Sequence, residues 1–233
     1  MKSKFYAVVT VTLFLAMFDA SAQRSVIVDA KGFSGVENSI SANVNVFQAA
    51  EYKVEVIAPQ DVIDALKIYV EDGTLRLKTK NRVNWSNSWE KIVVNVWSPN
   101  FSHLALNGSG DIIAKTPITA KEFSIKINGS GDVKIESLEA SSLVVKSNGS
   151  GDVLLGGKNV LDSAEYSVNG SGDIDAMQLS CKKVDANVTG SGDIDVWATE
   201  AFNAKIVGSG DIELKGNPTI DAKVVGSGNV KRK

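Results

Sequence analysis

Apolar and polar residues alternate strictly over the C-terminal part of the chain, in short runs on both sides of a repeated glycine-rich turn. Before a turn the apolar residues take every second position, as in Leu104 and Leu106, and the alternation resumes after it, as in Val133 and Ile135. Successive side chains of a strand leave on opposite faces, so a period of two predicts strands with one buried face. Each repeat is therefore expected to be two strands joined by a sharp corner.

The corner reads Gly-Ser-Gly, then Asp or Asn, then Ile or Val, and it occurs seven times. Its first glycine is at Gly108, Gly129, Gly149, Gly170, Gly190, Gly208 and Gly226, its second at Gly110, Gly131, Gly151, Gly172, Gly192, Gly210 and Gly228, and its polar residue at Asp111, Asp132, Asp152, Asp173, Asp193, Asp211 and Asn229. The copies begin 18 to 21 residues apart. This spacing is too short for a pair of helices and fits one coil of a β-solenoid.

The fold class that follows is all-β, a parallel β-helix whose consecutive corners lie on top of one another. The variable remainder of each coil carries an apolar residue, such as Ile118 or Leu138, and is expected to form a third side. Crossovers between parallel strands are overwhelmingly right-handed, so we expect a right-handed coil, although coils of 18 residues also suit a left-handed solenoid.

Glycine is expected twice at each corner because stacked corners leave no room for side chains, and because glycine adopts positive φ without a Cβ penalty. The corner aspartates would form a ladder of carboxylates. Glycine–aspartate repeats bind calcium in some β-rolls, but the period there is about nine residues, and the last copy here carries Asn229. Both Asp and Asn accept a backbone N–H in a turn, so we favour an Asx-type corner and predict no metal site or cofactor. Weak cation association along the ladder stays open.

Residues 23–100 lack the repeat but also read as strands, and residues 101–233 hold the solenoid. A short helix is expected from Asp61 to Leu66, and Glu71-Asp72-Gly73 reads as a hairpin turn. Because an exposed solenoid end is sticky, we expect this region to pack on the repeats or continue them, covering their first coil.

Residues 1–22 combine two early lysines, an apolar run and an Ala-Ser-Ala end, which predicts a cleaved signal peptide and an exported protein, in the periplasm, on the outer surface or secreted. No second segment is long enough to span a membrane. Cys181 is the single cysteine, so no internal disulfide can form, and we expect it to be a small buried filler. A net charge of −2 with interspersed signs argues against a nucleic-acid partner.

Few residues are candidates for ligand binding, metal binding or catalysis. Trp85 and Trp89 lie in a polar loop and could contact a sugar ring or a protein partner, or fold down as a lid on the solenoid, whereas Trp97 and Trp197 are expected to pack in strands or corners. The single histidine, His103, has no neighbouring ligand residue in the sequence and is expected to be structural. The acids at positions 175, 195 and 213 would lie on a flat sheet face, where a solvated surface is the simpler account than a catalytic pair.

Several segments resemble a known family. The segments 31–36, 52–56 and 72–75, together with the Asn-Gly-Ser-Gly-Asp corners, are similar to the auto-transporter adhesin head domain with the GIN motif, common in Bacteroidetes. The resemblance implies a secreted or outer-surface β-helix with an adhesin-like role. We therefore expect a non-enzymatic binding or structural module of the cell envelope that recognises a glycan or a surface protein through solenoid faces. The alternative is a polysaccharide-processing lyase or glycosidase on a β-helix.

Overall fold

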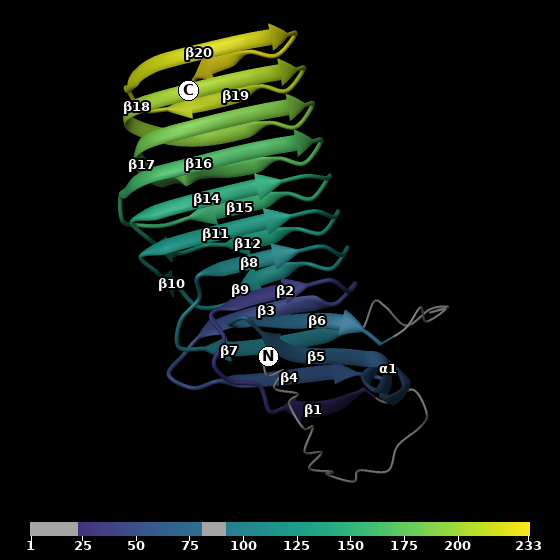
Figure 1. Ribbon diagram of the computed structural model, residues 1–233. Helices are drawn as coiled ribbons and strands as arrows, with labels where there is room; N and C mark the ends of the chain where they lie inside the picture. The colour runs from purple at the N-terminus through teal and green to yellow at the C-terminus, as the bar shows by residue number, and fades with distance from the viewer. Residues whose placement is uncertain (1–22, 81–91) are drawn as a thin grey trace, which may run out of the picture.

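The computed structural model describes residues 23–80 and 92–233, so the expected signal peptide lies outside the described residues. The protein is a stack of coils that rises from the N-terminal region to the last coil near residue 233 (Figure 1). Most strands pair in parallel with the strand one coil away, and the glycine corners are in register, with Gly190 opposite both Gly170 and Gly208. The predicted parallel β-solenoid is confirmed.

Each coil contributes a strand before its corner and a strand after it. The strands before the corner are β2 (Gly35–Asn38), β6 (Thr74–Thr79), β8 (His103–Leu106), β11 (Glu122–Ile127), β14 (Ser142–Ser147), β16 (Leu161–Gly170) and β20 (Thr219–Gly226). The strands after the corner are β3 (Asn43–Gln48), β7 (Val93–Ser98), β9 (Ile112–Ala114), β12 (Val133–Ile135), β15 (Val153–Gly156), β19 (Ile212–Lys215) and β21 (Val230–Arg232). Two long strands, β17 (Ile174–Gly190) and β18 (Ile194–Gly208), start after one corner and end at the next.

The third side is a short parallel pair in the early coils, β10 (Ile118–Thr119) with β13 (Leu138–Glu139). In the later coils β17 and β18 run through this side without a break, and their mutual register shifts there, between Ala176 and Ser180 and between Cys181 and Lys183. The coils therefore differ in length on this side, while their corners stay aligned.

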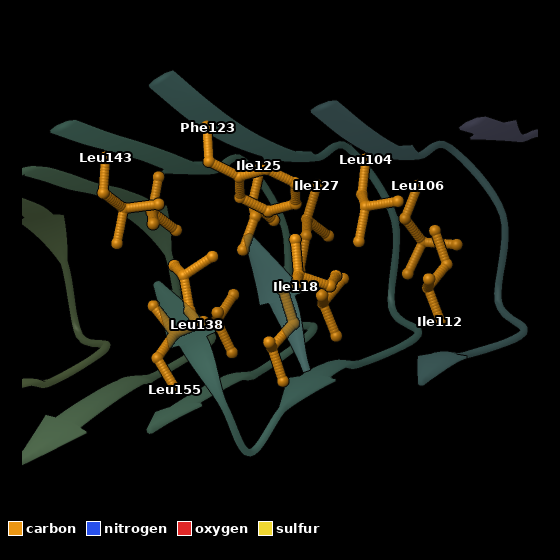
Figure 2. Packing of buried hydrophobic residues seen from close by; sticks show 14 of the residues in the cluster. Leu104, Leu106, Ile112, Ile118, Phe123, Ile125, Ile127, Leu138, Leu143 and Leu155 are labelled. Carbon is orange, nitrogen blue, oxygen red and sulfur yellow. The ribbon is translucent and has the colours of Figure 1, made fainter. Parts of the chain in front are cut away.

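The core runs along the inside of the stack. Leu104, Leu106, Ile125 and Ile127 from one side meet Ile118 from the third side, and all of them are buried (Figure 2). Full burial of one such side chain contributes about 1.5–3 kcal/mol, and the repeats supply it in every coil. The inward positions that the alternation predicts are buried, apart from the half-buried Ala114 and, in the last coil, Ala222 and Val224, which are exposed because no described strand covers them.

The N-terminal region both continues and closes the solenoid. β2 and β3 form a coil without the glycine motif, which lies between the β8–β9 coil and the strands β6 and β7. Beyond β6 and β7, the strands β5 (Leu66–Glu71), β4 (Lys53–Ala58) and β1 (Arg24–Val28) add in antiparallel order. This end of the rod is thus covered, as the stickiness of a bare coil predicts.

Two local predictions in this region are confirmed. The helix α1 spans Gln60–Ala65, one residue earlier at each end than expected. The β5–β6 hairpin turns through Asp72 and Gly73, both at positive φ, of 49° and 71°. An Asp-Gly pair suits such a turn because it matches the right-handed twist of the strands.

Candidate binding surface on the solenoid

The corners leave no space for side chains. A Cβ on Gly129 would lie 2.1 Å from the carbonyl oxygen of Gly108 one coil below, and a Cβ on Gly131 would lie 2.3 Å from that of Gly110. No real Cβ approaches a backbone oxygen so closely, so the backbone of the coil beneath, which is glycine for every copy after the first, excludes any side chain at these positions. In the later coils the first glycine also adopts positive φ, for example 126° at Gly190.

The corner aspartates are linked from coil to coil. The Oδ1 atom of each accepts a hydrogen bond from the backbone N–H of the polar corner residue in the next coil, at distances from 2.6 to 3.0 Å. The corner motif predicts donor and acceptor within a single turn, whereas the stacking of the corners brings the donor from the neighbouring coil. Asn43 occupies the rung below the first copy and accepts from Asp111 at 3.3 Å. Asn229 ends the ladder, where it donates to Asp211.

This arrangement gives the corner carboxylates a structural task. A hydrogen bond from Lys231 and another from the Asn229 backbone hold the pKa of Asp211 below its ordinary value. Within residues 23–80 and 92–233, no group of three or more His, Cys, Asp or Glu side chains is placed to hold a metal ion.

The strands after the corners, together with β4 and β1, which extend the same sheet, present one continuous outward row, which we call the long row. In register across eleven neighbouring strands it consists of Ile27, Glu55, Asn95, Asn45, Ile113, Lys134, Leu154, Asp175, Asp195, Glu213 and Lys231. At about 4.8 Å per strand the row extends for roughly 50 Å along the rod. The protein therefore offers a long, flat face with polar, apolar and charged positions in fixed order.

A polar network occupies the N-terminal part of the long row. The amide of Asn45 donates to Asn95 Oδ1 at 2.9 Å, and the amide of Asn95 donates to Glu55 Oε2 at 3.0 Å. Ser25 donates to Glu55 Oε1, also at 3.0 Å. The hydrogen bond from Asn95 leads the causes that hold the pKa of Glu55 below its usual value, so this carboxylate stays charged at neutral pH.

Aromatic side chains flank the network two residues further along the same strands. The rings of Phe47 and Trp97 stack at 4.7 Å with an angle of 10° between their planes, and Lys53 Nζ lies 4.5 Å from the Trp97 ring. Trp197 occupies the equivalent outward position on β18, with Lys215 Nζ 3.7 Å from its ring.

Trp97 and Trp197 lie in strands, as expected, and each packs against a residue of the neighbouring strand on the outer face, where both are half-buried. The alternation of the strands predicts this outward position, because Trp97 directly follows the inward Val96 and Trp197 directly follows the inward Val196. Trp85 and Trp89, the expected ligand contacts, lie outside the described residues.

The acids Asp175, Asp195 and Glu213 adjoin one another in the C-terminal part of the long row. Burial, followed by the charges of Glu213 and Asp175, raises the pKa of Asp195. Lys233 pairs with Glu213 at 3.2 Å. The three acids lie on a sheet face rather than across a groove, so their placement differs from the facing carboxylates that glycoside hydrolysis needs.

The remaining candidates lie away from this face. His103, on β8, contacts Thr74 Oγ1 and Ser102 Oγ through its two ring nitrogens, and burial together with the charge of Arg76 lowers its pKa. Its ring covers Gly35 so closely that a Cβ there would overlap it, at 1.9 Å. Cys181 is fully buried, and burial raises its pKa to about 11, so its thiol is unreactive at neutral pH.

Comparison with known proteins relates this geometry to a family and a fold. The sequence profile described as "Putative auto-transporter adhesin, head GIN domain" matches residues 32–218. A putative adhesin from Bacteroides fragilis has the same fold, with a TM-score of 0.86 and 28% identity over 91% of this chain and 97% of that one. No curated protein matches the sequence.

Two structures from Parabacteroides distasonis share the fold at lower identity. A putative lipid binding protein has a TM-score of 0.74 and 24% identity, and a putative adhesin has a TM-score of 0.71 and 23% identity. Each alignment covers 91% of this chain, with 97% and 98% of the respective neighbour. In the part of the chain that the structure describes, no helix is long and apolar enough to cross a bilayer.

Proposed function

Because the chain belongs to the family described as "Putative auto-transporter adhesin, head GIN domain", we propose that it is a non-enzymatic, adhesin-like module of the cell envelope. In this proposal the protein is exported, to the periplasm, the outer surface or the medium. It recognises a glycan or a surface protein through the outward faces of the solenoid, and the long row is the face that makes the contact.

The observation that carries the proposal is the continuity of the long row over eleven strands. The polar side chains of its N-terminal part are held by neighbours, as Asn95 is by Asn45 and Glu55, so they meet a partner with little loss of side-chain freedom. The half-buried Phe47 and Trp97 add apolar area beside these polar groups. Aromatic side chains next to fixed hydrogen-bonding groups are typical of surfaces that bind other molecules.

The flatness and length of this face favour an extended partner over a small ligand. Small molecules are held in concave sites, whereas a flat sheet face gains affinity by repeating modest contacts along its length. A linear glycan or an elongated surface protein can follow the rod and contact several coils at once. An adhesin-like role rather than catalysis agrees with this shape.

A glycan array and a panel of surface proteins, probed with the purified protein, test the proposal. Trp97→Ala should weaken the binding detected there by about tenfold or more, as truncation of a central aromatic contact does. Tyr69→Ala is the matched control, since Tyr69 also lies beneath a lysine, 4.9 Å from Lys67 Nζ, but on β5 rather than on the long row. Equal binding by the wild type and by variants of Trp97 and of the long row would contradict the proposal.

The same array separates binding from catalysis. Glycans that bind should be recovered unchanged in length after incubation with the protein. The appearance of shortened or unsaturated products would favour the polysaccharide-processing alternative. Asp195→Asn and Glu213→Gln would then identify whether the acids of the long row take part.

A further inference from the structure

The C-terminal end of the rod is an open sheet edge. In the ranges that the structure describes, β20 pairs only with β18, and β21 pairs only with β19. β20 is exposed along all eight of its residues. Large apolar side chains gather at this end, with Ile220 and Val224 each 41% exposed and Val225 53% exposed. At the top of Figure 1, β20 accordingly forms the last layer of the stack.

We propose that a second copy of this chain covers this end, with the β20 strands of the two copies paired in antiparallel order. The rod would thereby become a tail-to-tail dimer with its two covered ends outward. An edge strand with unpaired backbone groups and an uncovered apolar row is a template for another strand.

The backbone of β20 has its free groups in the right places. Ser227 N donates to Gly208 O at 2.9 Å, with Gly208 in register with Gly226. In a parallel ladder the backbone groups of alternate residues point to opposite neighbours. The N–H and C=O groups of Ile220, Ala222 and Val224 therefore point away from β18, toward the open edge. These same three residues have their side chains on the inward face, as the period of two requires.

The charges on β20 determine one register. When Ala222 lies opposite its own copy, Ile220 faces Val224 of the partner on the inner side, and Asp221 faces Lys223 of the partner on the outer side. The pairing then joins apolar to apolar and acid to base twice over, because the arrangement is two-fold symmetric. A shift by two residues in either direction would place Lys223 opposite Lys223 or Asp221 opposite Asp221, which is unfavourable.

The other strand of the last coil limits the contact to β20. Lys231 and Lys233 form ion pairs with Asp211 and Glu213 of their own chain, at 2.5 and 3.2 Å, and Arg232 is exposed beside them. Basic side chains block strand addition at an edge, and two such edges would repel each other. The contact is therefore one strand pair, which predicts a weak and reversible dimer.

Analytical ultracentrifugation of the purified protein tests this inference, with concentrations up to about 1 mM so that a weak contact is populated. The wild type should show a monomer–dimer equilibrium. Asp221→Lys and Lys223→Asp should each raise the dissociation constant by about tenfold or more, because each turns two attractive pairs into repulsive ones. The double exchange of both residues should restore the dimer, and a mixture of the two single variants should form the heterodimer. Circular dichroism checks that every variant is folded.

The outcomes that overturn the inference are distinct. A wild type that stays monomeric up to the highest concentration shows that a second copy does not cover this edge and refutes the inference. A dimer that persists unchanged in both single variants forms through another surface. A double exchange that fails to dimerise while remaining folded refutes the register. None of these results bears on glycan or protein binding by the long row, which is measured separately.

Discussion

Replacing Gly190 by alanine should lower the free energy of unfolding by about 2–6 kcal/mol, because two independent costs fall on this position. Its φ of 126° is a conformation that L side chains rarely adopt, which costs about 1–3 kcal/mol. Its new Cβ would also lie 2.3 Å from the carbonyl oxygen of Gly170, so the two coils must move apart. Overpacking of this kind costs about a further 1–3 kcal/mol.

Two other glycines separate these costs. Gly73 has a positive φ of 71° but open space around its would-be Cβ, so Gly73→Ala measures the conformational cost alone. Gly131 has no positive φ, but its Cβ would lie 2.3 Å from Gly110 O, so Gly131→Ala measures the contact alone. Urea unfolding followed by circular dichroism gives the three differences. The reasoning is refuted if Gly190→Ala costs no more than Gly73→Ala, or if Gly131→Ala costs nothing.

Three further expectations concern single side chains. Since the pKa of Asp195 is raised in the folded state, its ionisation costs stability as pH rises through the carboxyl range. Asp195→Asn should therefore raise the free energy of unfolding at pH 7 by less than about 1 kcal/mol, seen as a slightly higher melting temperature. At pH 3 the gain should vanish, because the carboxyl is then protonated. The lowered pKa of His103 means that the unfolded chain binds a proton first, so stability should fall as pH drops through about 6.5, and His103→Gln should flatten that slope in melting curves. Asp152→Ala removes the acceptor for the Asp173 N–H, which lies 2.8 Å away, and should cost about 1 kcal/mol, whereas Asp152→Asn should cost clearly less. A calcium-dependent melting temperature that these variants abolish would contradict the structural account of the ladder.

Local alternation was enough to predict which side chains face the core. The register between coils followed from the corner motif, because only glycine fits where a Cβ would meet a backbone carbonyl oxygen of the coil below. The coil made by β2 and β3 carries no such motif, and its place between β6–β7 and β8–β9 depends on strand pairings far apart in the sequence. For the same reason the bottom rung at Asn43 could not be recognised from its surroundings in the chain.

The long row could not be predicted from the sequence alone. Its members are ordinary outward residues when taken one strand at a time, and only the register across eleven strands joins them. Trp97 and Trp197 could have been placed outside from their phase relative to Val96 and Val196. Their position on the same face requires knowledge that β7 and β18 both follow a corner. Sequence patterns therefore predict which residues face the inside of the rod more readily than how the residues of its outer surface are arranged.

The differing lengths of the coils have a consequence for how such rods evolve. Because the extra residues of a longer coil are absorbed on the side away from the glycine corners, a whole coil can be duplicated or deleted in the gene without disturbing the alignment of the rest. Each event would change the reach of the molecule by one strand spacing and leave its ends intact. Rods of graded length, assembled from interchangeable units, are thus accessible by simple recombination.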